Sequence, residues 1–255
     1  MLDGKVVIIT GASEGIGASL AVALRKRGAL LTLASRSETK LRGVADSGAL
    51  SDSVIVPGDL TQEAARTAVV EKTMERRGRI DVLINNAGRG SYYAGSATPI
   101  DEARAVFDLN FFAPLALAQL AIPYLRATRG TIVNISSIAG QIPLPWLAVY
   151  SASKAALASI TATQRIELRR HGVNVMGVFP GYVNTKFQAN APGPRPPARV
   201  VQGKWFAVSA EDCAEAIARG IESRKRMVVT PGSGCPLVLM HRMFPALVES
   251  RLEAV

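Results

Sequence analysis

Residues 5–17 read KVVIITGASEGIG, a pattern that predicts a strand, a glycine-rich turn and a helix in succession. The apolar run Lys5–Thr10 predicts a buried strand that ends in a glycine-rich turn. Gly11 permits a tight turn, Gly15 lets the backbone approach a phosphate closely, and Gly17 lets the next helix pack against the sheet. The N-terminus of that helix offers unpaired N–H groups to phosphates. The spacing differs from the GxGxxG fingerprint, so the turn on its own does not identify a nucleotide site.

Short apolar runs and helical patterns alternate along most of the chain. Near-continuous apolar strands separated by helices are typical of a parallel sheet buried on both faces. We therefore predict a single α/β domain over residues 1–255, a doubly wound, Rossmann-type, mostly parallel sheet with helices on both faces. The further strands are expected at Leu30–Ala34, Val54–Val56, Ile80–Asn85, Thr131–Ser136 and Val173–Phe179. The helices are expected at Gly15–Gly28, Gln62–Arg77, Ile100–Leu125 (bent or ended early by Pro114 or Pro123) and Val149–His171.

Composition narrows the function classes. Hydrophobic residues make up 48% of the chain, which is enough for a substantial core. The two cysteines and two histidines lack the number and spacing of a metal centre, so we predict no metal site. No uninterrupted apolar run reaches the roughly 18 residues of a membrane helix, and the N-terminus does not resemble a secretory signal. We therefore expect a cytoplasmic protein.

The net charge of +10 comes from short basic clusters near expected helix ends, where cations complement the helix dipole. No basic stretch is interleaved with aromatic residues, as single-stranded nucleic acids would require for stacking. We therefore expect solvated helix ends rather than nucleic acid as a partner.

Two segments fall outside the regular pattern. Four prolines lie within Ala189–Val200, so this stretch is neither regular helix nor sheet. It is either a linker or part of a variable substrate lid at about 182–208. The tail at about 236–255 includes Leu237–Leu252, whose pattern predicts an amphipathic helix. We expect that helix to pack on its own domain or on a neighbouring subunit, and docking on an anionic membrane surface is the less favoured alternative.

The end of the second expected strand bears on the choice of dinucleotide. In doubly wound folds an acid about 20 residues after the glycine turn holds the ribose 2′-hydroxyl of NAD. Here the strand ends in Ala34-Ser35-Arg36, with no carboxylate. A guanidinium pairs well with a 2′-phosphate through two hydrogen bonds. The sequence therefore favours NADP (NADPH when reduced) over NAD.

Tyr150 and Lys154 lie one helical turn apart in an expected helix, so they share a face. A phenol has a pKa of about 10, and a nearby ammonium stabilises the phenolate and lowers that pKa. We therefore expect Lys154 to bring the Tyr150 pKa toward neutrality. Ser137 follows an expected strand, at the carboxyl edge where such sheets bind ligands, and its hydroxyl suits a substrate carbonyl.

Taken in order, these residues resemble the short-chain dehydrogenase/reductase family, in its short single-domain branch. The resemblance runs from Lys5 to about Thr185 and rests on the order and spacing of the motifs. These are Thr10-Gly11-x3-Gly15-x-Gly17, Asp59, Asn85-Asn86-Ala87-Gly88, Asn110, Ser137, Tyr150-x3-Lys154 and Pro180-Gly181-x-Val183-x-Thr185.

The resemblance implies an NADP-dependent oxidoreductase that moves a hydride between a nicotinamide and a carbonyl or alcohol carbon. Tyr150 would be the general acid in reduction, Lys154 would also hold the nicotinamide ribose, and Ser137 would position the carbonyl. Asn110 would hold a water that links Lys154 to solvent. The other residues expected along the cofactor are Gly11, Ser13, Gly15, Ile16, Gly17, Arg36, Asp59, Leu60, Asn86, Ala87, Gly88, Pro180, Gly181, Val183 and Thr185.

The residues after Thr185 match the family much less specifically, and substrate choice in the family usually resides there. The expected pocket walls, Ala139–Trp146 and the proline-rich stretch after Tyr182, are rich in apolar groups and poor in acids. They predict a lipophilic ketone, aldehyde or alcohol. The resemblance also implies a homodimer or homotetramer formed through the long helices. The alternatives are a non-catalytic NADP-binding sensor and, less consistent with the chain length, a nucleotide-sugar epimerase or dehydratase.

Overall fold

A computed structural model describes residues 2–47, 50–194 and 207–253. Its core is a seven-stranded parallel sheet with the strand order β3-β2-β1-β4-β5-β6-β7. The predicted α/β fold with a doubly wound sheet is confirmed. The strands are β1 Val6–Thr10, β2 Leu30–Ser35, β3 Val54–Pro57, β4 Val82–Asn85, β5 Thr131–Ile135, β6 Asn174–Pro180 and β7 Met227–Thr230.

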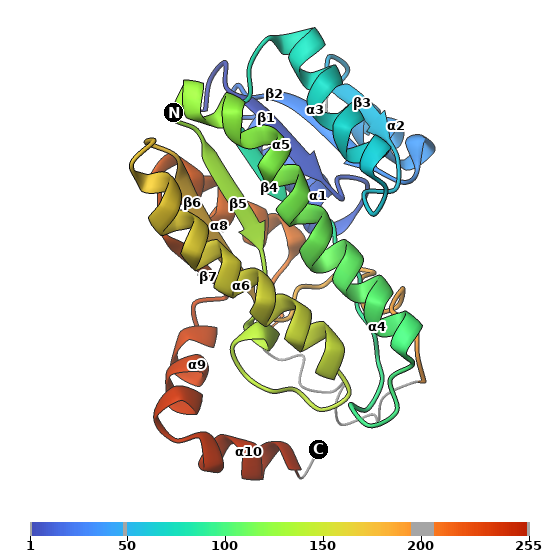
Figure 1. Cartoon of the computed structure of the whole chain (residues 1–255), viewed down its shortest axis with the longest axis vertical. Helices are drawn as coiled ribbons and strands as arrows, with labels where there is room; N and C mark the ends of the chain where they lie inside the picture. Colours follow the sequence, from blue (N-terminus) through green and yellow to red (C-terminus); the bar gives the residue numbers. More distant parts are fainter. Residues whose placement is uncertain (1, 48–49, 195–206, 254–255) are drawn as a thin grey trace.

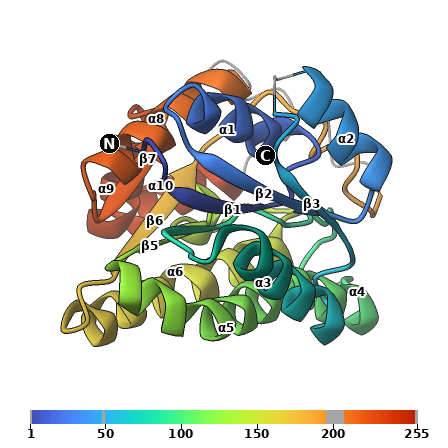
Figure 2. The same ribbon diagram turned by 90° about the horizontal axis from the view of Figure 1, so that it is seen from above.

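Helices cover both faces of the sheet (Figures 1 and 2). Each helical layer buries its own apolar cluster against the strands, one around Leu24 and Ile217 and the other around Leu117 and Leu168. The first layer contains α1 Gly15–Arg25, α2 Glu38–Ser47 and α8 Ala210–Glu222. The second layer contains α3 Glu63–Arg77, α4 Ile100–Phe107, α5 Ala113–Thr128 and α6 Ala148–Arg169.

The order of the strands reverses at β1, which pairs with β2 on one side and with β4 on the other. After β1 and β2 the chain continues into α1 and α2, which lie in one helical layer. After β4 and β5 it continues into α4 and α6, which lie in the opposite layer. In open parallel sheets this reversal leaves a crevice at the carboxyl ends of the strands. The fold therefore provides a ligand site between the loops that follow β1 and β4.

Among the described residues, the helices α2 and α8 and the edge strand β7 were not expected from the sequence. In α8 the apolar residues are mostly small, and Ala214, Ile217, Ala218 and Ile221 recur at helical spacing on the buried face. β7 is only four residues long and pairs with β6 alone. Both elements extend the sheet and its cover on the side away from β3.

The long helical region around Ile100–Leu125 is divided by a π-helix, η1 Asp108–Phe112, rather than by its prolines. Pro114 lies in the first turn of α5, and Pro123 lies inside α5 without ending it. The expected early end is therefore wrong, because the helix continues to Thr128. By length and composition alone, the whole stretch Ile100–Thr128 is long and apolar enough to cross a membrane. The sequence analysis considered only uninterrupted apolar runs and therefore did not find this stretch. Its buried residues pack against the sheet and α3.

The C-terminal tail forms two helices, α9 Gly234–Met243 and α10 Pro245–Glu253, which project from the body of the molecule (Figure 1). The break falls at Phe244–Pro245, where the sequence predicted one continuous helix. Six large apolar side chains of the tail are exposed: Leu237, Leu239, Met240, Met243, Phe244 and Leu247. Of the expected lid at 182–208, residues 195–206 lie outside the described residues, as do residues 254–255 of the tail.

Candidate active site

A cleft of about 610 Å³ runs along the carboxyl edge of the sheet, where the loops after β1, β2, β4, β5 and β6 converge. Of the residues predicted to form the site, Gly17 and Asn110 do not line it: Gly17 lies behind the glycine turn and Asn110 behind Gly88. Those that line it are Gly11, Ser13, Gly15, Ile16, Arg36, Asp59, Leu60, Asn86, Ala87, Gly88, Ser137, Tyr150, Lys154, Pro180, Gly181, Val183 and Thr185.

The glycine turn after β1 has room only for backbone. Gly11 and Gly15 have φ of +64° and +55°, in the left-handed region that favours glycine. A Cβ on Gly15 would lie 3.1 Å from Thr185 Cγ2, and a Cβ on Gly17 would lie 2.6 Å from Asn86 Nδ2. Helix α1 begins at Gly15, and the first turn of a helix leaves N–H groups without intrahelical partners. This bare backbone and helix N-terminus fit the diphosphate of a dinucleotide.

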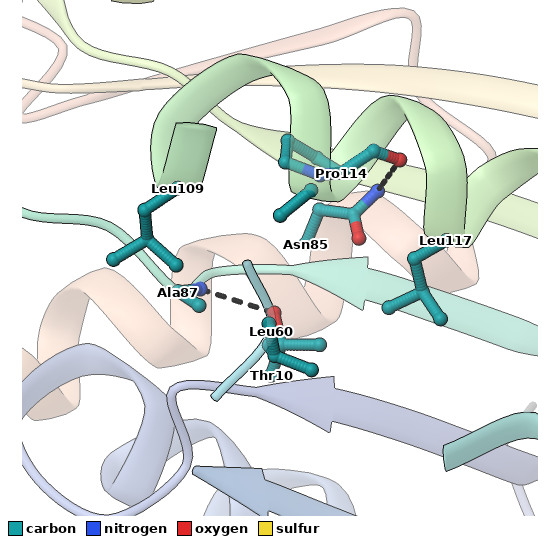
Figure 3. A pocket seen from close by; sticks show the side chains of 8 residues that line it. Thr10, Leu60, Asn85, Ala87, Leu109, Pro114 and Leu117 are labelled. Atoms are coloured by element: carbon teal, nitrogen blue, oxygen red, sulfur yellow. Dashed lines mark hydrogen bonds between the residues drawn. The ribbon is translucent and has the colours of Figure 1, made fainter. Parts of the chain in front are cut away.

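Thr10 and Asn86 hold the glycine turn to the loop after β4. The Thr10 hydroxyl accepts hydrogen bonds from the N–H groups of Asn86 (2.9 Å) and Ala87 (3.0 Å) and donates one to the Ile84 oxygen (3.2 Å). Asn86 Nδ2 donates to the main-chain oxygens of Thr10 (2.9 Å) and Gly11 (3.1 Å). Figure 3 shows the void beneath these groups, which at about 10 Å³ holds one water at most. It is packed interior beneath the cleft rather than a ligand site. Its lining is Thr10, Leu60, Asn85, Ala87, Leu109, Ala113, Pro114 and Leu117.

The loop after β2 forms the far end of the cleft. Arg36 is exposed and lines the cleft together with Ser37 and Lys40, two residues that the sequence analysis did not select. Ser37 Oγ accepts a hydrogen bond from the Lys40 N–H (3.3 Å) at the start of α2. Asp59, after β3, accepts hydrogen bonds from the Thr61 N–H and hydroxyl at 3.0 and 2.9 Å. The far end of the cleft therefore presents two cations and a fixed carboxylate.

Tyr150, Lys154 and Ser137 meet at the opposite end of the cleft. Tyr150 and Lys154 lie in the first two turns of α6 and are 9% and 3% exposed. Lys154 Nζ donates a hydrogen bond to the main-chain oxygen of Ile135 (2.9 Å) and lies 5.9 Å from the centre of the Tyr150 ring. Ser137 follows β5, and its hydroxyl hydrogen-bonds the phenol of Tyr150 and lies 3.4 Å from the Pro180 oxygen. The three groups share one face of the cleft.

Burial governs the ionisation of this group. It raises the pKa of Tyr150 to about 12, against a smaller lowering by the hydrogen bond with Ser137. Burial likewise lowers the pKa of Lys154 to about 8. The expectation that Lys154 brings the Tyr150 pKa toward neutrality is therefore wrong for this arrangement, because burial has the larger effect. The ammonium hydrogen-bonds a backbone carbonyl, and both side chains are withdrawn from water. Near neutral pH the pair consists of a neutral phenol and an ammonium.

Asn110 lies in the π-helix η1 and is fully buried. Its side chain accepts a hydrogen bond from the Arg89 N–H (2.9 Å) and donates to the Arg89 oxygen (3.0 Å) and Ser153 Oγ (3.0 Å). A Cβ on Gly88 would lie 3.1 Å from Asn110 Oδ1 and 3.3 Å from Lys154 Nζ. Asn110 therefore fixes the loop that covers Lys154. Its implied part in a water link to solvent stays a prediction.

The wall Ala139–Trp146 and the described part of the stretch after Tyr182 both flank Tyr150, and a third segment joins them. The Tyr92 N–H donates to the Pro192 oxygen (2.9 Å), and the Tyr93 N–H donates to the Trp146 oxygen (3.0 Å). The ring of Phe187 lies 5.7 Å from that of Tyr150. Apolar and aromatic side chains dominate this end of the cleft: Tyr92, Ile138, Ala139, Leu144, Leu147, Tyr182, Phe187 and Ala191.

Comparison with known proteins agrees with this geometry. The chain matches the short chain dehydrogenase family over residues 5–194. It belongs to the short-chain dehydrogenase/reductase family. As a member, it is an oxidoreductase that interconverts carbonyl and alcohol groups with a nicotinamide cofactor.

Relatives of this short-chain dehydrogenase span plants, fungi and bacteria. It is 34% identical to the 11-beta-hydroxysteroid dehydrogenase-like 2 of Arabidopsis thaliana, over 100% of this chain and 82% of that protein. It is 39% identical to the short-chain dehydrogenase ptmH of Penicillium ochrochloron, over 84% of this chain and 79% of that protein.

Two solved bacterial dehydrogenases have the same fold and carry different cofactors. One from Burkholderia phymatum, in complex with NAD, has a TM-score of 0.86 at 25% identity, covering 96% of this chain and 95% of its own. One from Burkholderia cenocepacia J2315, in complex with NADP, has a TM-score of 0.83 at 28% identity, covering 99% and 98%. The fold therefore accommodates either dinucleotide.

The cleft residues that sequence reasoning missed in this short-chain dehydrogenase come from the start of α2 and from loops. Lys40 lies four positions after Arg36, and Glu14 lies inside the glycine turn itself, so both were within reach of the motif. Tyr92 and Asn190 had no such signal, because only the folded loops bring them to the cleft.

Proposed function

We propose that this short-chain dehydrogenase reduces a lipophilic ketone or aldehyde with NADPH, or oxidises the matching alcohol with NADP. The observation that carries the proposal is the layout of one cleft. Arg36 and Lys40 lie at one end, the bare glycine turn lies at the middle, and Tyr150 lies with Ser137 at the other end. A dinucleotide laid along this cleft would be held at its phosphates by the glycine turn and would bring its nicotinamide to Tyr150 and Ser137.

The choice of NADP rests on the end of β2. Arg36 follows that strand where an acid would hold a ribose diol, and a guanidinium suits a 2′-phosphate instead. Among the described residues Arg36 has no carboxylate partner, so its donors are available to a ligand. Ser37 lines the same end and adds a hydroxyl.

The roles of the side chains follow from their positions. The cofactor supplies or accepts the hydride. Tyr150, neutral near pH 7, donates its phenolic proton to the carbonyl oxygen as the alcohol forms. The Ser137 hydroxyl lies beside the phenol and would donate a hydrogen bond that orients the same oxygen. The Lys154 ammonium stabilises the phenolate left behind, since a full positive charge lies beside the ring.

The lipophilic substrate is proposed from the walls around Tyr150. Phe187 and Tyr92 are aromatic, Leu144 and Leu147 are aliphatic, and none of the four carries a charge. Such walls exclude water and favour apolar surface over a carboxylate or phosphate. The names of the plant relatives point to hydroxysteroids, which are substrates of this kind.

Two further proposals concern partners. Five exposed apolar side chains lie on α4, η1, α5 and α6, and they support a homodimer or homotetramer that covers them: Ile100, Phe112, Leu120, Tyr124 and Ile166. We keep the cytoplasmic location as a prediction. Membrane docking through the exposed tail remains the less favoured prediction.

A substrate screen that monitors NADPH absorbance tests the proposal. The panel pairs lipophilic ketones, aldehydes and alcohols with carboxylated or phosphorylated carbonyl compounds, each with NADPH (or NADP) and with NADH (or NAD). The proposal expects turnover of lipophilic carbonyls with a preference for NADPH. Turnover confined to charged substrates would contradict the substrate class, and a clear preference for NADH would contradict the cofactor.

A further inference from the structure

Glu14 is a carboxylate placed inside the phosphate-binding turn. It is the N-cap residue of α1, a position where a short polar side chain such as Asp or Ser commonly caps the helix, and its own side chain makes no capping hydrogen bond. The carboxylate turns instead toward the cleft, which it lines. Its position places a negative charge where a negatively charged ligand is expected.

Two residues from other parts of the chain hold this carboxylate. Lys40 Nζ, from α2, lies 3.0 Å from Glu14 Oε2 as an ion pair. Asn190 Nδ2, from the segment beside the substrate end, donates to Glu14 Oε1 at 3.0 Å. All three residues line the same cleft as Arg36. At this end of the cleft, the Lys40 ammonium is therefore already paired with a carboxylate, whereas Arg36 has no carboxylate partner among the described residues.

We propose that Glu14 is a specificity-determining residue that opposes the 2′-phosphate of NADP by pairing with Lys40. This inference rests on the proposed function, because it assumes that the adenosine ribose lies beside Arg36. A 2′-phosphate recruits Lys40 only by competing with Glu14, whose own charge also repels it. The 2′-hydroxyl of NAD is uncharged, so it neither competes with Glu14 for Lys40 nor is repelled by the Glu14 carboxylate. Glu14 therefore reduces the preference for NADP that Arg36 establishes.

The size of the effect follows from exposure. Lys40 and Glu14 are 60% and 40% exposed, and ion pairs in water are worth little. Removing the Glu14 charge should therefore improve 2′-phosphate affinity about five-fold, which is about 1 kcal/mol. Because the charges are exposed, the gain should shrink as salt concentration rises.

Glu38 provides a matched control. It carries the same charge one position after Ser37, but it pairs with Arg42 at 2.6 Å within α2 and does not line the cleft. Glu38→Gln changes the net charge as Glu14→Gln does and leaves the Lys40 pair intact. A general charge effect would change the affinity for the 2′-phosphate equally in both variants, whereas the proposed contact changes that affinity only in Glu14→Gln.

Isothermal titration of the full chain with adenosine 2′,5′-bisphosphate and with 5′-AMP tests the inference without turnover. Glu14→Gln should bind the 2′,5′-bisphosphate about five-fold more tightly and 5′-AMP unchanged, while Glu38→Gln should match the parent for both. In a Lys40→Gln background, Glu14→Gln should give less than half of its gain. Circular dichroism confirms that each variant is folded.

The outcomes separate the inference from the proposed function. If the parent binds the 2′,5′-bisphosphate and Glu14→Gln changes nothing, or improves both ligands equally, the inference is overturned and the proposed cofactor stands. A full gain for Glu14→Gln without Lys40 overturns the inference as well. If neither the parent nor Glu14→Gln binds the 2′,5′-bisphosphate, both the inference and the choice of NADP are overturned.

Discussion

Lys154 Nζ lies 5.9 Å from the centre of the Tyr150 ring and donates a hydrogen bond to the Ile135 main-chain oxygen rather than to the phenol. The two groups act through charge at short range rather than through direct contact. Burial disfavours the charged form of each group, so it shifts their two pKa values in opposite directions. The pKa of Tyr150 rises to about 12 and that of Lys154 falls to about 8. Near pH 7 the phenol therefore carries the proton that carbonyl reduction consumes.

The first prediction concerns pH. Below about pH 8 Lys154 is an ammonium, and above it the charge that stabilises the developing phenolate is lost. We expect kcat/KM for carbonyl reduction to be level from pH 6 to about 8 and to fall above that. Lys154→Arg, whose charge persists, should remove the fall while lowering the plateau. A rate that climbs between pH 8 and 9.5 would refute this account of Lys154.

Arg36→Asp tests the cofactor choice. The substitution removes a guanidinium that suits a 2′-phosphate and installs the acid that suits a ribose diol. The ratio of kcat/KM for NADPH to that for NADH should fall by about 10- to 100-fold. Arg42→Asp, which makes the same charge change on α2 outside the cleft, is the control and should leave the ratio within two- to three-fold of the parent. Equal ratios in Arg36→Asp and the parent would assign 2′-phosphate recognition to another residue.

A pair of glycines tests the packing of the phosphate turn. A Cβ on Gly17 would overlap the Gly11 main-chain oxygen and the Asn86 side chain, so Gly17→Ala should destabilise the fold by about 1–3 kcal/mol and abolish nucleotide binding. Gly43, in α2, has no neighbour within 4 Å of its added Cβ, so Gly43→Ala should stabilise by about 0.5–1 kcal/mol. Thermal unfolding measures both. Similar shifts in the two variants would mean that the turn is looser than described.

Quaternary structure is the subject of the fourth prediction. Leu120 on α5 and Met240 on α9 are similarly exposed, at 37% and 42%. If the long helices form the subunit interface, Leu120→Asp should yield monomers in light scattering after gel filtration, and Met240→Asp should remain assembled. The reverse result would move the interface to the tail.

The sequence predicted best where chemistry is local. The glycine turn and the Tyr150–Lys154 spacing are short motifs, and their occurrence in one chain indicates a dinucleotide-dependent enzyme more strongly than either motif alone. The structure brings both motifs to one cleft. The direction of the Tyr150 pKa shift was missed because the phenol lies beside Tyr92 and Phe187, which are distant from Tyr150 in the sequence and reach it only in the folded chain.

Helix α8 and the Glu14–Lys40 ion pair were not predicted from the sequence, for two different reasons. α8 had a readable pattern, since Ala214, Ile217 and Ile221 recur at helical spacing, but its small residues concealed an apolar face. The Glu14–Lys40 pair had no pattern at all. It exists because β1 and β2 are neighbours in the sheet, so that the turn after one strand and the helix after the other meet at the same edge.

The role of Tyr150 as proton donor is tested by the rate of NADPH oxidation in Tyr150→Phe with the best carbonyl substrate from the screen. Tyr92→Phe, which removes another buried phenol of the same cleft, is its control. If Tyr150 is the proton donor, Tyr150→Phe should bind NADPH normally by fluorescence and lose about 100- to 10,000-fold in kcat, while Tyr92→Phe stays within about ten-fold of the parent. Near-parental turnover in Tyr150→Phe would contradict the account, because another group would then have to supply the proton.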